Sequence, residues 1–225
     1  MMSLERRQRQ LRWFDLTLIA LSAPVWLPAI GVVALVVLVT SGRPIFFTQQ
    51  RIGRGRRPFS MVKFRTMLSG PNPIVPDQSR ITPIGHLLRR TSLDELPQLF
   101  NVIAGDMSLV GPRPMLPALS NRVGRGASLR FAVRPGMTGL AQVNGRNAIS
   151  WEQRLRYDQI WVDALCVSAA TQVLAQTASV VVSGNGIDGH DPADPLIADV
   201  PTDEPMHLED VRQRSADSIQ KRGAA

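Results

Sequence analysis

Hydrophobic residues are concentrated in one long run near the start of the chain. Leu16–Gly42 contains 27 residues and no charged side chain, which is long enough to cross a bilayer as a helix. A straight helix over Trp13–Thr40 would be about 42 Å long, whereas the hydrocarbon layer is about 30 Å thick. Pro24 and Pro28 lie within this run, and each removes a backbone donor and clashes with the preceding turn. We therefore expect a helix that breaks at these prolines.

Arginines flank the apolar run on both sides. Four precede it and five follow it closely: Arg6, Arg7, Arg9 and Arg12, then Arg43, Arg51, Arg54, Arg56 and Arg57. Basic flanks favour the cytoplasmic face, so neither end has a reason to cross the membrane. This pattern favours a re-entrant helix–break–helix on one face, and a simple spanning anchor is the open alternative. A signal peptide does not fit, because the apolar region is too long and a basic cluster follows it.

The next segment alternates in the manner of β-strands. Residues 44–67 include PIFFTQQRI and FSMVKFRTM, joined by the turn GRGRRP, and predict a β-hairpin. In the second strand Lys63 and Arg65 share one face, opposite Val62 and Phe64. Two cations on one face form either a candidate phosphate clamp or a solvated basic edge.

Helical patterns dominate the remainder, so the expected fold class is mainly α, of the α+β kind. Residues 150–165 predict an amphipathic helix with a capping box between Ser150 and Gln153. Residues 166–182 predict a second apolar helix that carries two glutamines one turn apart. We expect these amphipathic helices to lie on the membrane or against the protein rather than to cross. Residues 134–147 predict a structured loop of the kind that carries functional sites.

Charge divides the chain unevenly. Residues 1–186 carry 22 Lys and Arg against 9 Asp and Glu, whereas residues 187–225 carry 4 against 9. The basic part requires an anionic partner, and we expect no nucleic acid, because aromatic side chains are not interleaved with the charges. We expect three parts: 1–42, the basic N-terminus and re-entrant membrane helix; 43–186, a catalytic domain on the cytoplasmic face; and 187–225, an acidic, disordered tail.

Candidate chemistry centres on two adjacent acids, Asp94 and Glu95, in the stretch TSLDELPQLFNVIAGDMSLVGPRP. Ser92 and Glu95 fit a capping box, which is the structural interpretation. Pro97 argues against it, because a helix that begins at Ser92 would lose a backbone hydrogen bond at Pro97. A start near Leu96 leaves the acids just outside the positive helix end, where they suit a nucleophile or metal ligands.

The residues that follow the acids add to this chemistry. The next helix is expected to face a core or the membrane with an apolar stripe, and to carry Gln98 and Asn101 on the opposite side. The stripe consists of Leu96, Leu99, Phe100 and Ile103. Arg113 then lies between two prolines, and a guanidinium held on a stiff backbone suits a diphosphate. The histidines are isolated, so zinc is not expected, and oxygen ligands favour Mg²⁺.

These motifs resemble the bacterial sugar transferases, specifically the small monotopic phosphoglycosyl transferases. The resemblance spans about residues 9–187 and rests on RWFD, FFTQQRIG, KFRTM, RRTSLDELPQLFNVIAGDMSLVGPRP and VRPGMTGLAQVNGRNAISW. It implies a monotopic membrane protein that moves a sugar-1-phosphate from a UDP-sugar to polyprenyl (undecaprenyl) phosphate and releases UMP. It places that reaction at the cytoplasmic leaflet of the bacterial inner membrane, as the first membrane step of glycoconjugate or exopolysaccharide synthesis.

The resemblance also implies roles for individual residues. Asp94 falls on the nucleophile, which forms a covalent aspartyl-phosphosugar, and Glu95 completes the dyad, with Mg²⁺ held near both. Arg113 falls on the phosphate-binding arginine, and Arg89 on the arginine five residues before the nucleophile. Three further basic positions match the site: Lys63, Arg65 and Arg146.

The match has departures and leaves questions open. Pro28 falls on the kink proline of the family, but Pro24 is additional and Leu27 stands where a serine is frequent. An inactive scaffold of the same fold, serving a glycan assembly complex, is the alternative function, and the retained acid pair argues against it. The sequence does not specify the sugar, the downstream glycan or the oligomeric state, a homo-oligomer included.

Overall fold

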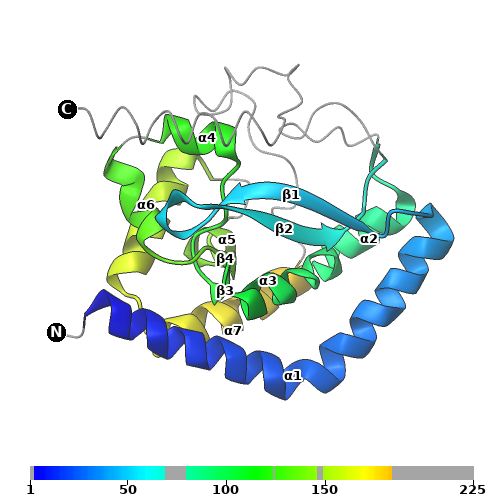
Figure 1. Cartoon of the computed structure of the whole chain (residues 1–225), viewed down its shortest axis with the longest axis horizontal. Helices are drawn as coiled ribbons and strands as arrows, with labels where there is room; N and C mark the ends of the chain where they lie inside the picture. Colours follow the sequence, from blue (N-terminus) through cyan, green and yellow to red (C-terminus); the bar gives the residue numbers. More distant parts are fainter. Residues whose placement is uncertain (1–2, 69–79, 124, 146–148, 184–225) are drawn as a thin grey trace.

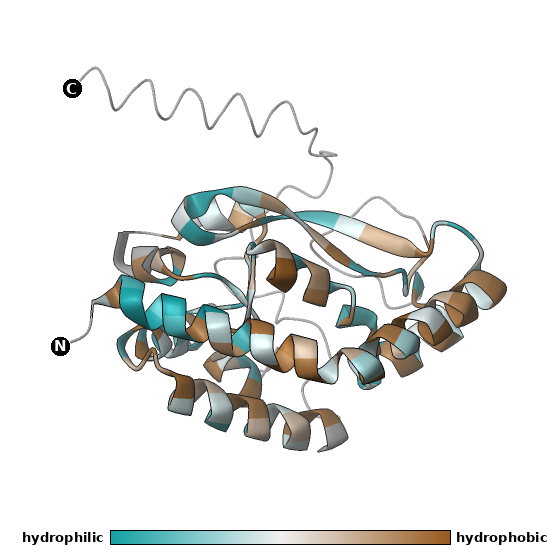
Figure 2. Ribbon diagram, turned by 60° about the horizontal axis from the view of Figure 1, so that its bottom comes forward, coloured by the Kyte–Doolittle hydropathy of each residue, from teal (hydrophilic) through white to brown (hydrophobic). Residues whose placement is uncertain are grey.

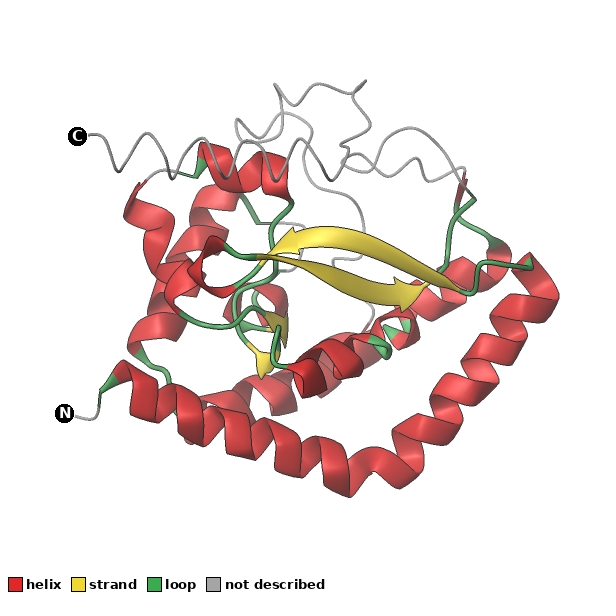
Figure 3. Ribbon diagram, in the orientation of Figure 1, coloured by secondary structure: helices red, strands yellow, loops and turns green. Residues whose placement is uncertain are grey.

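The computed structural model describes residues 3–68, 80–123, 125–145 and 149–183. It is mainly helical, with one long helix, α1 (Leu4–Ser41), that runs along two sides of the molecule, and a β-hairpin between the other helices (Figures 1 and 3). The predicted tail, 187–225, lies outside the described residues, as do residues 69–79. The expected mainly α class with a small hairpin is confirmed.

Helix α1 is bent about midway along its length (Figure 1). Pro24 and Pro28 are its internal prolines, and proline is a common cause of such kinks. Side chains bond to carbonyls of the turn before Pro24: the Ser22 hydroxyl donates to Leu18 O at 2.6 Å, and the Trp26 indole N–H donates to Ile19 O at 2.9 Å. The structure thus shows a bent helix, and its placement in a membrane stays a prediction.

Much of the apolar surface of α1 is left uncovered. By length and composition, α1 is the one described helix able to cross a membrane. Only 17% of its most apolar window is buried inside the protein. Five side chains beyond the bend or next to it are 61–76% exposed: Leu21, Val25, Val32, Leu35 and Val39. In Figure 2 the first turns of α1 are polar and its later turns mostly apolar. A contiguous exposed apolar surface of this kind marks a membrane or protein contact.

The predicted hairpin is confirmed, with strands that begin two residues later and end three residues earlier than 44–67, and its turn contains a glycine. Strand β1 (Phe46–Ile52) pairs antiparallel with β2 (Pro58–Phe64) from Phe46 opposite Phe64 to Ile52 opposite Pro58. In the connecting turn Gly55 adopts φ 65°, a left-handed conformation that glycine adopts readily. Helix α3 (Gln98–Ala104) lies between the hairpin and α1 (Figure 1), and Lys63 near the end of β2 contacts Glu95 of the acid pair.

A second, parallel pair of strands corrects the expected loop at 134–147. Strand β3 (Ser108–Val110) pairs with β4 (Gly136–Thr138), and a short helix α5 (Leu140–Val143) follows. The two strand segments approach so closely that a Cβ on Gly136 would lie 2.0 Å from the Gly111 nitrogen. Glycine at this crossing, rather than hydrophobic periodicity, permits the pairing, which is why the pattern alone predicted a loop.

Helix α3 (Gln98–Ala104) presents its faces differently from the expectation. Gln98 and Asn101 are buried, and the Asn101 side chain accepts from Val62 N at 3.1 Å and donates to Ser60 O at 2.8 Å. The amide therefore joins α3 to the edge of β2. Phe100 and Ile103, from the predicted apolar stripe, are 47% and 42% exposed.

The remaining helices close the core around the strands. They are α2 (Pro83–Arg90), α4 (Pro117–Arg122), α6 (Trp151–Asp163) and α7 (Val167–Ser183). The predicted capping box at Ser150 and Gln153 is confirmed at the start of α6. Trp161 of α6 and Val173 of α7 pack against Leu11 of α1, so α7 packs along the domain, as expected, with its glutamines exposed.

Candidate active site

The acid pair lies on a tight turn between α2 and α3. Leu93–Glu95 form a single 3₁₀ turn, η3, and α3 begins three residues later, at Gln98. Ser92 adopts the left-handed conformation, φ 56° and ψ 17°, and its side chain caps nothing. The capping-box interpretation of Ser92 and Glu95 is therefore wrong. Left-handed backbone at a non-glycine residue is costly and clusters at functional sites.

Glu95 is tied down by two cations on one oxygen. Lys63 Nζ, from β2, lies 2.5 Å from Glu95 Oε1, and Arg113 Nη2 lies 3.2 Å from the same atom. Burial raises the pKa of Glu95, but Lys63 and Arg113 outweigh burial and lower it to about 2. Glu95 is thus an anion at any physiological pH. Within the described residues its Oε2 atom accepts no hydrogen bond.

Asp94 is in the opposite situation. It is buried, and within the described part of the chain its carboxylate makes no hydrogen bond and no ion pair. Burial raises its pKa to about 6, and the charge on Glu95 adds to this, while Lys63, Arg89 and Arg113 oppose it. A desolvated carboxylate that remains ionised at neutral pH and is not engaged by a donor suits a nucleophile.

Two further arginines surround the pair. Arg89, from the last turn of α2, donates from Nε to the Thr66 hydroxyl at 2.9 Å and acts on Asp94 through its charge. Arg51, at the end of β1, donates to Pro114 O at 3.1 Å and to Gln49 Oε1 at 2.6 Å. Burial lowers the pKa of Arg51 to about 9, with Arg113 adding to this and Glu95 opposing it.

Arg51 is a site residue that the sequence analysis did not single out. It appeared there only as part of the basic flank of the membrane helix. Its position two residues after Gln49 in the alternating strand was an available signal, since both fall on one face. With Arg51 included, four cations act on the two carboxylates, so the described site has a surplus of positive charge.

The other predicted basic residues either make their contacts elsewhere in the protein or lie outside the described residues. Arg65 follows the end of β2, and its guanidinium donates to the carbonyls of Ser41 and Gly42 at the end of α1. It therefore joins α1 to the hairpin, and its described contacts give no support for a phosphate role. Arg146 lies outside the described residues, so its placement at the site stays a prediction.

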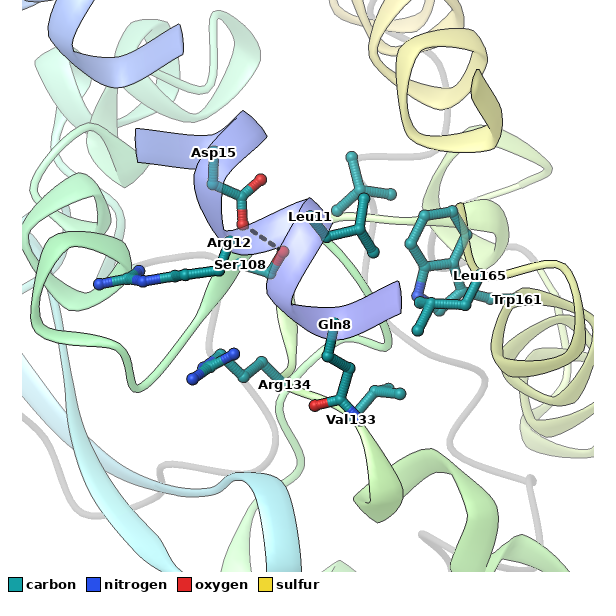
Figure 4. A pocket seen from close by; sticks show the side chains of 10 residues that line it. Gln8, Leu11, Arg12, Asp15, Ser108, Val133, Arg134, Trp161 and Leu165 are labelled. Atoms are coloured by element: carbon teal, nitrogen blue, oxygen red, sulfur yellow. Dashed lines mark hydrogen bonds between the residues drawn. The ribbon is translucent and has the colours of Figure 1, made fainter. Parts of the chain in front are cut away.

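The N-terminal half of α1 is docked by polar contacts that explain the RWFD motif. Arg12 donates to the carbonyls of Val102 and Ile103, which end α3. Asp15 accepts from the Ser108 hydroxyl at 2.6 Å and lies beside a small cavity of about 20 Å³ (Figure 4). These contacts have a structural role: they fix α1 to the strand that leads to Arg113.

Comparison with known proteins agrees with this arrangement. A model of the family described as bacterial sugar transferase matches residues 6–184. The uncharacterized sugar transferase EpsL of Bacillus subtilis is 42% identical over 187 residues, which cover 78% of this chain and 89% of that protein. The UDP-galactose-lipid carrier transferase of Erwinia amylovora is 36% identical over 195 residues, which cover 78% of this chain and 41% of that protein.

A third relative has a more explicit name. The UDP-glucose:undecaprenyl-phosphate glucose-1-phosphate transferase of Klebsiella pneumoniae is 39% identical over 148 residues, or 60% of this chain and 32% of that protein. The chain thus spans less than half the length of the Erwinia and Klebsiella proteins. The family match covers most of the chain, including the bent helix, the hairpin and the acid pair. The chain is a transferase enzyme and belongs to the bacterial sugar transferase family.

Proposed function

We propose that this protein transfers a sugar-1-phosphate from a UDP-sugar to polyprenyl phosphate through a covalent intermediate on Asp94. The observation that carries the proposal is the division between the two acids. Glu95 is engaged by Lys63 and Arg113, whereas the buried Asp94 carboxylate has no partner among the described residues. The names of the Erwinia and Klebsiella relatives support a nucleotide-sugar donor and a lipid acceptor.

The chemical steps balance without a further reactant. An Asp94 oxygen attacks the phosphorus that bears the sugar, and the bond from that phosphorus to the bridging oxygen breaks. UMP leaves with the bridging oxygen, and an aspartyl-phosphosugar remains. An oxygen of polyprenyl phosphate then attacks the same phosphorus, which forms the diphosphate-linked sugar and restores the Asp94 carboxylate.

The surrounding charges offset the repulsion between reactants. A carboxylate that approaches a phosphate oxygen pays about 4 kcal/mol per pair of charges at 4 Å and an effective dielectric constant near 20. Lys63 and Arg113 face the same carboxylate oxygen of Glu95, and the Arg113 side chain is 39% exposed, so it is accessible to a substrate phosphate. Preorganised cations of this kind stabilise charge that develops in phosphoryl transfer.

The donor set also fits a magnesium ion. The described residues contain no cluster of three or more His, Cys, Asp or Glu. A magnesium ion would therefore be held by the carboxylates of Asp94 and Glu95 together with oxygens of the substrate phosphates. Both carboxylates ionise below neutral pH, and Glu95 Oε2 is without a hydrogen bond in the described part of the chain. When bound, Mg²⁺ supplies charge neutralisation for the diphosphate.

The bent helix suits a re-entrant placement at the cytoplasmic face of the bacterial inner membrane. Exposed Phe100 of α3 lies beside the bend of α1, because Trp26 at the bend packs edge-on against it with 5.6 Å between ring centroids. A lipid phosphate at that surface would be near the acid pair, which lies just before α3. This arrangement brings an aqueous donor and a lipid acceptor to one site.

The proposed function is tested with purified full-length protein, Mg²⁺, a panel of UDP-sugars and undecaprenyl phosphate in detergent. We expect UMP and a lipid-linked sugar diphosphate from one or more donors, and neither from Asp94→Asn. A correctly folded wild-type protein that yields no UMP with any donor would contradict the proposal and favour the inactive scaffold.

A further inference from the structure

We infer that Arg130 is a positioning residue for Arg113, acting through the Arg113 backbone rather than on the substrate. Arg130 lies in the 3₁₀ segment η4 (Arg125–Ala132) and is buried, with 5% exposure. Its Nη2 atom donates to the Arg113 carbonyl oxygen at 2.5 Å. The inference rests on the proposed function, because it assigns Arg113 to the substrate phosphates.

The segment that carries Arg113 has few amide donors of its own. Pro112 and Pro114 have no N–H, so the segment depends on its carbonyl groups for anchoring. Four successive carbonyls are each held from another element. The donors are Gly136 N to Pro112 O, Arg130 to Arg113 O, Arg51 to Pro114 O and Ile52 N to Met115 O.

Arg130 is held in turn by a carboxylate from α6. Its Nη1 atom lies 3.1 Å from Asp158 Oδ2, and both side chains are at most 4% exposed. The contact is a close ion pair that lacks the geometry of a hydrogen bond. Charge on Arg154 also acts on Asp158, so this carboxylate is balanced by more than one cation.

The energetics favour a role in positioning over a role in stability. A buried ion pair gains little over a well-packed apolar pair, because removing both charges from water offsets their attraction. What the charged pair provides here is a donor at a fixed point below Arg113. The side chain of Arg113 then reaches Glu95 Oε1 at 3.2 Å and stays 39% exposed toward solvent. Misplacement by about 1 Å costs as much as 100-fold in rate in other enzymes.

The test uses Arg130→Met in the full-length protein. Methionine is unbranched, keeps the apolar stem of the side chain and has no donor, and Asp158 keeps the charge of Arg154. The matched control is Leu165→Ala, which removes a buried side chain from the core between α1, α6 and α7, a cluster that holds no residue of Pro112–Met115. We expect Arg130→Met to lower kcat/KM for UMP release at least about tenfold. Leu165→Ala should lower kcat/KM less, even if both variants lose the same amount of Tm.

A double-mutant cycle separates positioning from a direct or structural role. In an Arg113→Gln background, Arg130→Met should cost less than about twofold, because the group that it positions is gone. An equal loss in both backgrounds would overturn the inference. Arg130→Lys keeps the charge and supplies a second variant if Arg130→Met fails to fold.

Hydrogen exchange gives a readout that does not depend on activity. We expect the peptide that covers residues 111–116 to exchange faster in Arg130→Met than in Leu165→Ala. Unchanged exchange of this peptide in Arg130→Met would overturn the inference, whatever activity the variant has. Faster exchange together with a wild-type enzyme that releases no UMP would contradict the proposed function while leaving Arg130 as the anchor of this segment.

Discussion

Lys63 Nζ lies 2.5 Å from Glu95 Oε1, a contact that joins the inner strand of the hairpin to the turn before α3. Among the neighbouring charges, Lys63 lowers the pKa of Glu95 most. It also lowers the pKa of Asp94 most, against the effect of burial, which raises that pKa. One side chain of β2 therefore keeps both carboxylates ionised. The hairpin is part of the catalytic apparatus in this account, rather than only a support for it.

Removing the Lys63 charge should shift the pH dependence of the reaction. In Lys63→Met the pKa values of both Asp94 and Glu95 rise, so the acidic limb of the pH–kcat/KM profile moves to higher pH. We also expect activity at its optimum to fall about 10²-fold or more, as for loss of one electrostatic stabiliser. Arg90→Met, which removes an exposed cation from the end of α2, is the control. An unchanged acidic limb in Lys63→Met would contradict this role.

The raised pKa of Asp94 makes two linked predictions. Because the nucleophile must be ionised, wild-type activity should rise with pH through about 6. For stability, a carboxyl whose pKa is higher in the folded state favours folding below its unfolded pKa and loses that contribution as pH rises through about 6. Asp94→Asn should therefore be inactive yet melt higher than wild type at pH 8, by a margin that shrinks toward pH 5. A lower Tm for Asp94→Asn at pH 8 would show that the carboxylate is stabilised by its cations.

The exposed residues of α3 should contribute to membrane binding. Phe100→Gln with Ile103→Gln should weaken flotation with anionic vesicles, at a cost in stability of about 1 kcal/mol because Phe100 loses its ring contact with Trp26. Ile160→Gln on α6, with the same 47% exposure as Phe100, is the matched control. Equal vesicle binding by all these variants would mean that α3 does not face the lipid.

The two ends of α1 should be accessible from the same side of the membrane. In a Cys166→Ser background, single cysteines at Ser3 and Ser41 are treated with a membrane-impermeant maleimide in intact cells and in inverted vesicles. A re-entrant helix predicts that both label only in inverted vesicles. Labelling of one position in intact cells and the other in inverted vesicles would establish a spanning anchor.

Local patterns predicted the elements whose geometry depends on neighbouring residues. The hairpin follows from alternation around a glycine turn, and the capping box at Ser150 was correct because nothing nearby disrupts it. The same motif at Ser92 failed, since Pro97 delays α3 and Ser92 turns left-handed. The alternation of the second strand also predicted Lys63 as a site residue, and the structure places it against Glu95.

Long-range contacts account for what the sequence did not reveal. The faces of α3 could not be assigned from polarity, because Asn101 replaces a neighbouring strand by bonding to Val62 and Ser60. Arg51 and Arg130 looked like any other arginine until the fold brought them to consecutive carbonyls of one segment. Such roles depend on pairings more than 15 residues apart in the chain, for which a single sequence carries no local pattern.

The covalent role of Asp94 is tested most directly by intact mass spectrometry. Detergent-purified protein is mixed with Mg²⁺ and each UDP-sugar, without a lipid acceptor, and wild type is compared with Asp94→Asn. The account predicts a sugar-phosphate adduct on wild type alone, lost when polyprenyl phosphate is added. Release of UMP with acceptor present but no adduct under any condition would contradict the covalent role of Asp94 and indicate direct transfer between the two substrates.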